Sequence, residues 1–324
     1  MNEAGAQGGW TELHRHLDGA VRWETLEALA REQGVRVPSP RRLRLRPGMG
    51  LDAALESFRP ILSVLQRPED VRRVAAEACE DAAAEGIEHL ELRFAPQLHR
   101  GAGPADIVDA ALEGVAGRAG LVLCGLYGEP PGVLAELVAI ARDRPGVVGI
   151  DLAGGPQPSH RWILEDAARA FRMAAEAGLG RTVHAGEGRP PEEIALAVEV
   201  LGAQRIGHGT TLLDDPEVAA LVVDRGVTVE ACLSSNVHTG AIARLEEHPL
   251  REWLARGVRV ALCTDNPVLS GTTLANEHAA ALRLLGGDEE ALGRTLRCAR
   301  EAAFARGEAP RVAKEDETTA PPPR

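Results

Sequence analysis

Short runs of apolar residues alternate along the chain with longer segments in which apolar residues recur every three or four positions. The short runs have the length and composition of buried strands, and the longer segments have the period of amphipathic helices. We predict strands at residues 11–16, 87–94, 121–126, 147–152, 181–184, 205–207, 227–232 and 258–263. The helices predicted between them include 68–85, 104–119, 161–177, 191–201 and 216–224, several of which begin with a proline at the first turn.

Eight strands with intervening helices predict a parallel (β/α)₈ TIM barrel, for which about 250 residues are typical. A doubly wound sheet is the alternative α/β fold, but no glycine-rich nucleotide loop follows the first strand. The additional length lies mainly at residues 23–67, where we expect one helix, a basic loop and an amphipathic helix at 51–65. We predict a single domain over residues 1–307. Residues 308–324 are rich in proline and charge and are expected to be disordered.

Composition narrows the classes of function. Hydrophobic residues make up 44% of the 324 positions and aromatic residues only 3%, so aliphatic side chains must fill the core. The net charge of −12 disfavours binding to nucleic acid. Five dispersed cysteines without a C-x-x-C pair fit a reducing compartment. Neither a signal peptide nor an apolar run of membrane-spanning length is recognisable, so we expect a cytoplasmic protein without membrane contact.

A His14-Arg15-His16 pair at the end of the first predicted strand is the first sign of chemistry. Residues i and i+2 of a strand point to the same side, so both imidazoles can converge on one ion. Three further motifs follow apolar runs in the same way: His184-Ala185-Gly186-Glu187, Gly207-His208-Gly209 and Thr264-Asp265-Asn266-Pro267. Each therefore lies where a strand ends and a loop begins, which in a barrel of this type is the rim that carries active sites.

These four motifs, in this order, resemble those of the adenosine deaminase family of the amidohydrolase superfamily. The resemblance extends from His14 to the helix after Asp265, and it implies an amidohydrolase-type barrel with one Zn²⁺ per chain. By the same resemblance His14, His16, His184 and Asp265 are the metal ligands. The implied reaction is hydrolytic deamination of a 6-aminopurine nucleoside, a small-molecule substrate.

The resemblance also assigns roles around the metal. Glu187 shares a proton with purine N1, His208 holds and deprotonates the attacking water, and Asp265 helps to aim that water. A carboxyl group such as that of Glu187 must be protonated when substrate is bound, which burial favours. The resemblance also implies four substrate contacts: His16, Asp18 at the ribose 5′-hydroxyl, the backbone N–H of Gly154 at N3, and Asn266.

Three features of the sequence bear on substrate specificity. Asn266 stands where many relatives carry an aspartate that contacts N7, and its amide can donate to that acceptor. The segment Leu126-Tyr127-Gly128 replaces one in which relatives often carry an arginine. In the predicted helix at 51–65, Leu51, Leu55 and Phe58 are candidates for lining the substrate cleft or for packing onto the barrel, and Ala54 is small where relatives are larger.

The expected substrates are adenosine and 2′-deoxyadenosine, with free adenine or aminodeoxyfutalosine as alternatives. A non-catalytic barrel used for binding is a further alternative, although all the metal and acid residues are present. The binuclear branch of the superfamily bridges its metals with a carboxylated lysine, whereas the single lysine here is Lys314, near the C-terminus. The cytidine-type pattern H-x-E with P-C-x-x-C is absent from the sequence. The oligomeric state is left open.

Overall fold

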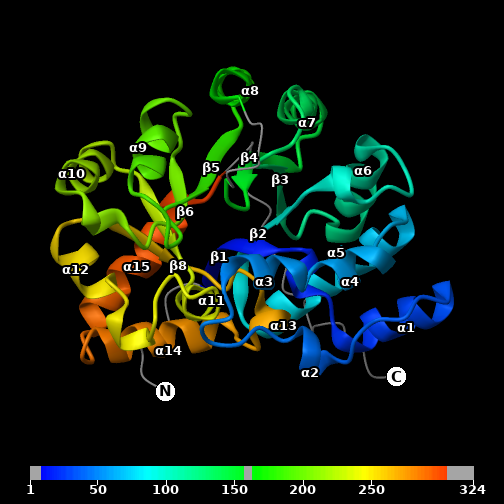
Figure 1. Cartoon of the computed structure of the whole chain (residues 1–324), viewed down its shortest axis with the longest axis horizontal. Coiled ribbons are helices and arrows are strands. Elements are labelled where there is room, and N and C mark those ends of the chain that lie inside the picture. The colour runs from blue at the N-terminus through cyan, green and yellow to red at the C-terminus, as the bar shows by residue number, and fades with distance from the viewer. Residues whose placement is uncertain (1–8, 157–162, 305–324) are drawn as a thin grey trace, which may run out of the picture.

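The computed structural model describes residues 9–156 and 163–304. Its centre is one parallel sheet in which the strands follow each other in sequence order, with helices arranged around the outside (Figure 1). The eight strands are β1 (Trp10–His16), β2 (Ile87–Phe94), β3 (Gly120–Leu126), β4 (Val147–Ala153), β5 (Gly180–Ala185), β6 (Arg205–His208), β7 (Thr228–Ala231) and β8 (Arg259–Leu262). The predicted (β/α)₈ barrel is confirmed.

The barrel closes between its first and last strands through residues of the site itself. The backbone N–H of His16 donates to the carbonyl of Asp265 over 2.8 Å, and the N–H of Asp265 donates to the carbonyl of His14 over 2.8 Å. Glu12 reinforces this seam, because its carboxylate accepts hydrogen bonds from the backbone N–H groups of His14 and Thr264, each at 3.0 Å. Closure of the sheet therefore brings the histidine pair against Asp265.

The barrel interior beneath the site contains ion pairs. On β2, Leu92 packs in the main apolar core, while its neighbour Arg93 faces the opposite side, as alternation along a strand requires. The Arg93 guanidinium lies 2.9 Å from Asp151 on β4 and 2.8 Å from Glu230 on β7. Since β4 and β7 are not neighbours of β2, these side chains meet inside the barrel.

Phe304 covers the end of the barrel opposite to the strand carboxyl ends. The centroid of its ring lies 3.5 Å from the Arg205 guanidinium carbon, and its side chain also packs with Val122 and Val148. Gly180 makes room for this ring, since a Cβ atom there would lie 2.1 Å from Phe304. The chain thus closes the bottom of the barrel with its own last described residue.

Helices cover the outside of the sheet and one group covers its mouth. The outer helices are α5 (Pro68–Ala84), α6 (Pro104–Val115), α7 (Val133–Arg142), α8 (Leu164–Glu176), α9 (Glu192–Glu199), α10 (Pro216–Asp224), α12 (Leu250–Ala255), α14 (Leu274–Leu284) and α15 (Glu289–Ala302). The prediction at 104–119 was too long because α6 ends at Val115, where the next residue, Ala116, has a left-handed φ of 48°. Positions 161 and 162 of the predicted helix at 161–177 lie outside the described residues.

The insertion at 23–67 differs from its prediction in two respects. It contains α1 (Trp23–Gln33), the short α2 (Pro40–Leu43) within the basic loop, α3 (Leu51–Glu56) and α4 (Arg59–Val64). The single helix predicted at 51–65 is therefore wrong. Pro60 explains the break, because proline lacks an N–H and its ring clashes with the carbonyl four residues earlier, so it is tolerated only in the first turn of α4.

Two short helices complete the rim: α11 (Leu233–His238) follows β7, and α13 (Pro267–Ser270) follows β8. Within the part of the chain that the structure describes, none of the helices is both long and apolar enough to cross a membrane. The predicted disordered tail at 308–324 lies outside the described residues.

Candidate metal centre and active site

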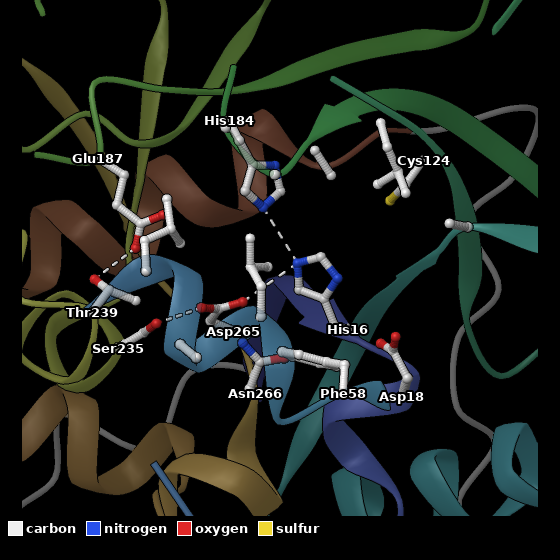
Figure 2. A pocket seen from close by; sticks show the side chains of 18 of the residues that line it. His16, Asp18, Phe58, Cys124, His184, Glu187, Ser235, Thr239, Asp265 and Asn266 are labelled. Carbon is white, nitrogen blue, oxygen red and sulfur yellow. Dashed lines mark hydrogen bonds and ion pairs between the residues drawn. The ribbon is translucent and has the colours of Figure 1, made fainter. Parts of the chain in front are cut away.

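Every residue that the sequence analysis assigned to the site lies at the carboxyl ends of the strands. His16 ends β1, His184 is the penultimate residue of β5 and His208 ends β6. Asp265 follows β8 by three residues, and Glu187 follows β5 by two. Figure 2 shows His16, His184, Asp265 and Glu187 around one space, so the prediction of a shared rim is confirmed.

Four donor atoms surround a common point at this rim. His16 Nε2 lies 3.3 Å from His184 Nε2 and 3.4 Å from Asp265 Oδ1, and His14 Nε2 lies 3.5 Å from the same Asp265 oxygen. Two ligands about 2.1 Å from one ion at tetrahedral angles are about 3.4 Å apart. His14 Nε2 is also buried and has no hydrogen-bond partner among the described residues. The residues present therefore fit a single metal ion.

His208 approaches the same point from β6. One of its ring nitrogens groups with ligand atoms of His14 and Asp265 within 4.8 Å. It differs from the other three histidines because its Nδ1 is hydrogen-bonded to Asn236 and its Nε2 lies 3.7 Å from Glu187 Oε2. His208 thus lies between the donor cluster and Glu187.

Buried carboxylates orient two imidazoles of the donor cluster. His14 Nδ1 lies 2.7 Å from Glu230 Oε2, and His184 Nδ1 lies 3.1 Å from Asp151 Oδ1. Donation of the Nδ1 proton to a carboxylate leaves each Nε2 lone pair free for the ion. Burial raises the pKa of Asp151, but His184 and Arg93 outweigh it and hold that pKa below its ordinary value. Asp151 therefore stays ionised to perform this task.

Asp151 and Glu230 were not predicted in this role from the sequence. Each is a fully buried acid within an otherwise uncharged strand, Val147–Ala153 and Thr228–Ala231 respectively. An isolated acidic residue in an otherwise apolar strand is the signal that could have identified them, because such a charge must be paired.

The backbone at two of the site residues is strained. His208 has a φ of 70° and Asp265 a φ of 61°, a region that residues other than glycine seldom adopt. Such conformations cost free energy and are concentrated at functional sites, where the surrounding structure enforces them. Gly207, just before His208, must lack a side chain, since a Cβ atom there would lie 3.0 Å from the His14 ring.

Glu187 faces the donor cluster from the loop after β5. Burial, together with the negative charge of Asp265, raises the pKa of the Glu187 carboxyl to about 7. Its Oε1 accepts a hydrogen bond of 2.9 Å from the Thr239 hydroxyl (Figure 2). A carboxyl with this pKa can both give and take a proton near neutral pH, as general acid–base catalysis requires.

Helix α11 and the residue after it contact three of the site residues at once. Ser235 Oγ donates to Asp265 Oδ2 over 2.5 Å, Asn236 contacts His208, and Thr239 contacts Glu187. The sequence analysis missed these residues. The available signal is the polar run from Ser234 to Asn236, which begins one turn after a buried strand ends at the rim.

A cavity of about 330 Å³ opens beside the donor cluster. Its wall includes Asp18, Gly154 and Asn266, which the sequence analysis assigned to the substrate, and no lysine or arginine among the described residues. Burial raises the pKa of the Asp18 carboxyl to about 6. In Figure 2, Asp18 lies on the His16 side of the cavity and Glu187 on the opposite side. A ligand that reaches both would span the donor cluster.

The mouth of the cavity is apolar. Leu51, Ala54 and Leu55 of α3 line it, and so does Phe58 at the break between α3 and α4. Leu55 remains 40% exposed, which places it at the entrance. The three candidates for lining the cleft, Leu51, Leu55 and Phe58, thus all line the cavity, and the small Ala54 lies beside them in its wall.

Tyr127, the only tyrosine of the chain, also lines the cavity. Its hydroxyl donates to the carbonyl of His184 over 3.3 Å. The departure from the family pattern at Leu126-Tyr127-Gly128 had put the geometry of the loop after β3 in question. In the structure this loop adds an aromatic side chain to the cavity wall and a hydrogen bond to the backbone of His184.

The sequence matches the family model described as adenosine deaminase over residues 10–314. The chain belongs to the adenosine deaminase family. An adenosine deaminase from Klebsiella pneumoniae is 36% identical over 300 residues, which span 86% of this chain and 89% of that protein. A probable adenosine deaminase from Dictyostelium discoideum is 35% identical over 290 residues, which span 84% of this chain but only 37% of that longer protein.

Solved structures of deaminases and amidohydrolases share this adenosine deaminase family fold. An adenine deaminase from Arthrobacter aurescens superposes with a TM-score of 0.83 at 26% identity, over 92% of this chain and 94% of the other. An amidohydrolase from Burkholderia ambifaria, which contains bound zinc, superposes with a TM-score of 0.84 at 25% identity, over 94% of this chain and 89% of the other.

Proposed function

We propose that this member of the adenosine deaminase family catalyses the zinc-dependent hydrolysis of adenosine and 2′-deoxyadenosine to the corresponding inosines and ammonia. The observation that carries the proposal is the placement of Glu187, whose carboxyl pKa is raised to about 7, across from four convergent metal donors in one cavity. A hydrolytic deaminase needs both an activated water and a group that protonates the ring.

Zinc is the ion that best suits three imidazoles and one carboxylate, and His14, His16, His184 and Asp265 would hold it. Bound there, zinc supplies a nucleophile at neutral pH because it lowers the pKa of water to about 7. The relative from Burkholderia ambifaria, whose structure contains bound zinc, supports this assignment.

Glu187 delivers a proton to purine N1, which makes C6 electron-poor. The oxygen of the water then forms a bond to C6, one proton of the water is carried to N6, and the C6–N6 bond breaks. The amine leaves as ammonia and N1 keeps its proton, while the C6 hydroxyl gives the second water proton to the Glu187 carboxylate and C6 becomes a carbonyl. Because the raised pKa of Glu187 lies near neutrality, the carboxyl can donate this proton and later recover one.

His208 and Asp265 hold the attacking water from two sides. Asp265 is fixed by the hydrogen bond from Ser235, and His208 by that from Asn236. Both residues have positive φ angles, so the backbone also fixes their direction. Positioning of this kind contributes to the rate because the water meets C6 in a reactive orientation.

Three contacts orient the nucleoside. Asp18 accepts a hydrogen bond from the ribose 5′-hydroxyl, the backbone N–H of Gly154 donates to N3, and the Asn266 amide donates to N7. All three residues line the cavity. Gly19 supports the last contact, since a Cβ atom on it would lie 2.0 Å from Asn266 Oδ1 and displace the amide.

The test is a panel of adenosine, 2′-deoxyadenosine, adenine and aminodeoxyfutalosine, followed by ammonia release and by the absorbance change on loss of the 6-amino group. Adenosine and 2′-deoxyadenosine are expected to have the highest kcat/KM. Removal of metal should abolish turnover, and added zinc should restore it in the wild type but not in His16→Ala. Preference for adenine, or full activity of the metal-stripped protein, would overturn the proposal.

A further inference from the structure

A row of three buried polar side chains runs from the outer layer of the barrel to the active site. It begins at His248, passes through Asn236 of α11 and ends at His208, whose exposed fractions are 5%, 0% and 1%. His248 Nε2 lies 3.4 Å from Asn236 Oδ1, and Asn236 Nδ2 lies 3.0 Å from His208 Nδ1. Asn236 and His248 do not line the cavity, so they act on the reaction only through His208.

A backbone amide fixes the direction of the hydrogen bonds in this row. The N–H of Leu250 donates to His248 Nδ1 over 3.2 Å. A backbone N–H can only donate, so His248 Nδ1 must carry a lone pair. Burial lowers the pKa of His248 to about 3, so the ring is neutral and its one proton lies on Nε2. His248 Nε2 therefore donates to Asn236 Oδ1.

The amide of Asn236 in turn fixes the direction of the hydrogen bond to His208. Its Oδ1 accepts from His248, so its Nδ2, which can only donate, is the group that faces His208 Nδ1. Reversal of the amide would place Nδ2 against the Nε2–H of His248, and two donors would oppose each other. The orientation of Asn236 thus follows from the amide of Leu250 and not from the position of the side chain alone.

We propose that the relay from Leu250 through His248 and Asn236 holds the proton of His208 on Nε2, the nitrogen that faces Glu187 in the cavity. Nδ1 accepts from Asn236 and cannot carry the proton without placing two donors together. In this state Nε2 has no lone pair toward the cavity. Asn236 and His248 are positioning residues that set which face of the His208 ring is a donor.

This inference rests on the proposed function and changes one role within it. The family resemblance leads us to expect that His208 removes a proton from the attacking water. With its proton on Nε2, His208 instead donates a hydrogen bond to the oxygen that bonds to C6. The proton leaving the water passes to the Glu187 carboxylate, which has just protonated N1, and from there to N6, so that ammonia leaves. The C6 hydroxyl proton returns to Glu187.

The direct test is nitrogen NMR of the full zinc-loaded chain with labelled histidine. The His208 signals are assigned by their loss in His208→Gln, and the couplings of each ring nitrogen report whether it carries a proton. We expect a protonated Nε2 and an unprotonated Nδ1 at neutral pH. A proton on Nδ1 would overturn the proposal. This readout does not depend on turnover, so it remains decisive if the proposed deaminase activity fails.

Asn236→Asp provides a second test with almost no change of shape. A carboxylate can only accept, so it draws the His208 proton to Nδ1 and removes the donor from the cavity. We expect kcat to fall by about 10²–10³, the effect of removing one donor to a developing negative charge, with a smaller change in KM. Unchanged or faster turnover would show that His208 acts as a base and would overturn the proposal.

Two matched variants separate this effect from general damage. Asn276→Asp makes the same substitution at an exposed position of α14 and should leave kcat and the His208 signals unchanged. His248→Gln keeps an N–H that can reach Asn236, so it should keep the proton of His208 on Nε2. If His248→Gln moves that proton although the protein is folded, His248 does not set the direction of the relay and the proposal fails.

Discussion

Nδ1 of His14 lies 2.7 Å from a carboxylate oxygen of Glu230, although 216 positions separate the two residues in sequence. Both side chains are fully buried. Glu230 also lies 2.8 Å from the Arg93 guanidinium and 2.7 Å from that of Arg205, and the two arginines keep its pKa well below the ordinary value despite burial. The carboxylate is therefore ionised and holds the Nδ1 proton of His14, which leaves the Nε2 lone pair facing the other donor atoms.

Glu230→Gln should weaken metal binding although Glu230 is not a ligand. The amide no longer favours the Nδ1–H form of His14, and loss of such a partner typically costs 10–100-fold in metal affinity. Competition with a zinc chelator measures this. Glu246→Gln, on the exposed 3-10 turn Leu245–Glu247, is the control and should bind zinc as the wild type does. Equal affinities of the two variants would contradict the orienting role.

Glu187→Gln should keep the metal and lose most of the rate. The residue is not among the convergent donors, and an amide cannot deliver the proton that its carboxyl gives to N1. A general acid–base group contributes about 10²–10⁴ in rate. Metal content and kcat are measured on the same preparation, with His16→Ala as the variant that should lose both. Loss of zinc in Glu187→Gln would assign it to metal binding instead.

Asp18 should exclude nucleoside 5′-monophosphates. Its carboxylate lines a cavity whose described wall offers no lysine or arginine to a phosphate, and like-charge contact in a partly desolvated cleft costs several kcal/mol. We expect kcat/KM for adenosine to exceed that for its 5′-monophosphate greatly at pH 8, above the Asp18 pKa of about 6. In Asp18→Asn the kcat/KM for adenosine should exceed that for the 5′-monophosphate by a smaller factor. If the wild type prefers the monophosphate, Asp18 does not contact the ribose 5′-hydroxyl.

Asn266 should make the enzyme sensitive to the purine N7 atom. In 7-deaza-adenosine a C–H replaces the acceptor and leaves the buried amide unpaired, at a cost of about 1–3 kcal/mol. Steady-state kinetics should therefore show a kcat/KM lower than that of adenosine. Gly19→Ala, whose added Cβ displaces the Asn266 amide, should reduce the difference. Equal kcat/KM values for both nucleosides in the wild type would show that Asn266 does not contact N7.

Phe304 should stabilise the barrel without affecting its chemistry. Its ring packs against the Arg205 guanidinium and two valines at the end of the barrel opposite to the metal donors. Truncation of a buried phenylalanine costs about 3–5 kcal/mol. Denaturant unfolding of Phe304→Ala should show this loss, while Val200→Ala, at an exposed position, should not. A lower kcat of Phe304→Ala at denaturant concentrations where the protein is still folded would indicate coupling between the two ends of the barrel.

The sequence by itself determined the architecture and which of its motifs share one rim of the barrel. Repeated strand–helix units force all strands to run parallel, so residues that follow any strand reach the same rim. This is why His14 and His16 could be grouped with Asp265 across 250 positions without a structure. The break between α3 and α4 was also encoded in the sequence, because the steric effect of Pro60 is local. The apolar pattern alone predicted one continuous helix there.

Only the tertiary structure decided how the site residues are oriented. Glu230 and Asp151 read as single acids within their strands, and their contacts with His14 and His184 arise only when the barrel closes. The direction of the row ending at His208 depends on the amide of Leu250, which no local pattern marks. Sequence periodicity specifies which face a residue occupies, whereas hydrogen-bond direction depends on distances between segments that only folding brings together.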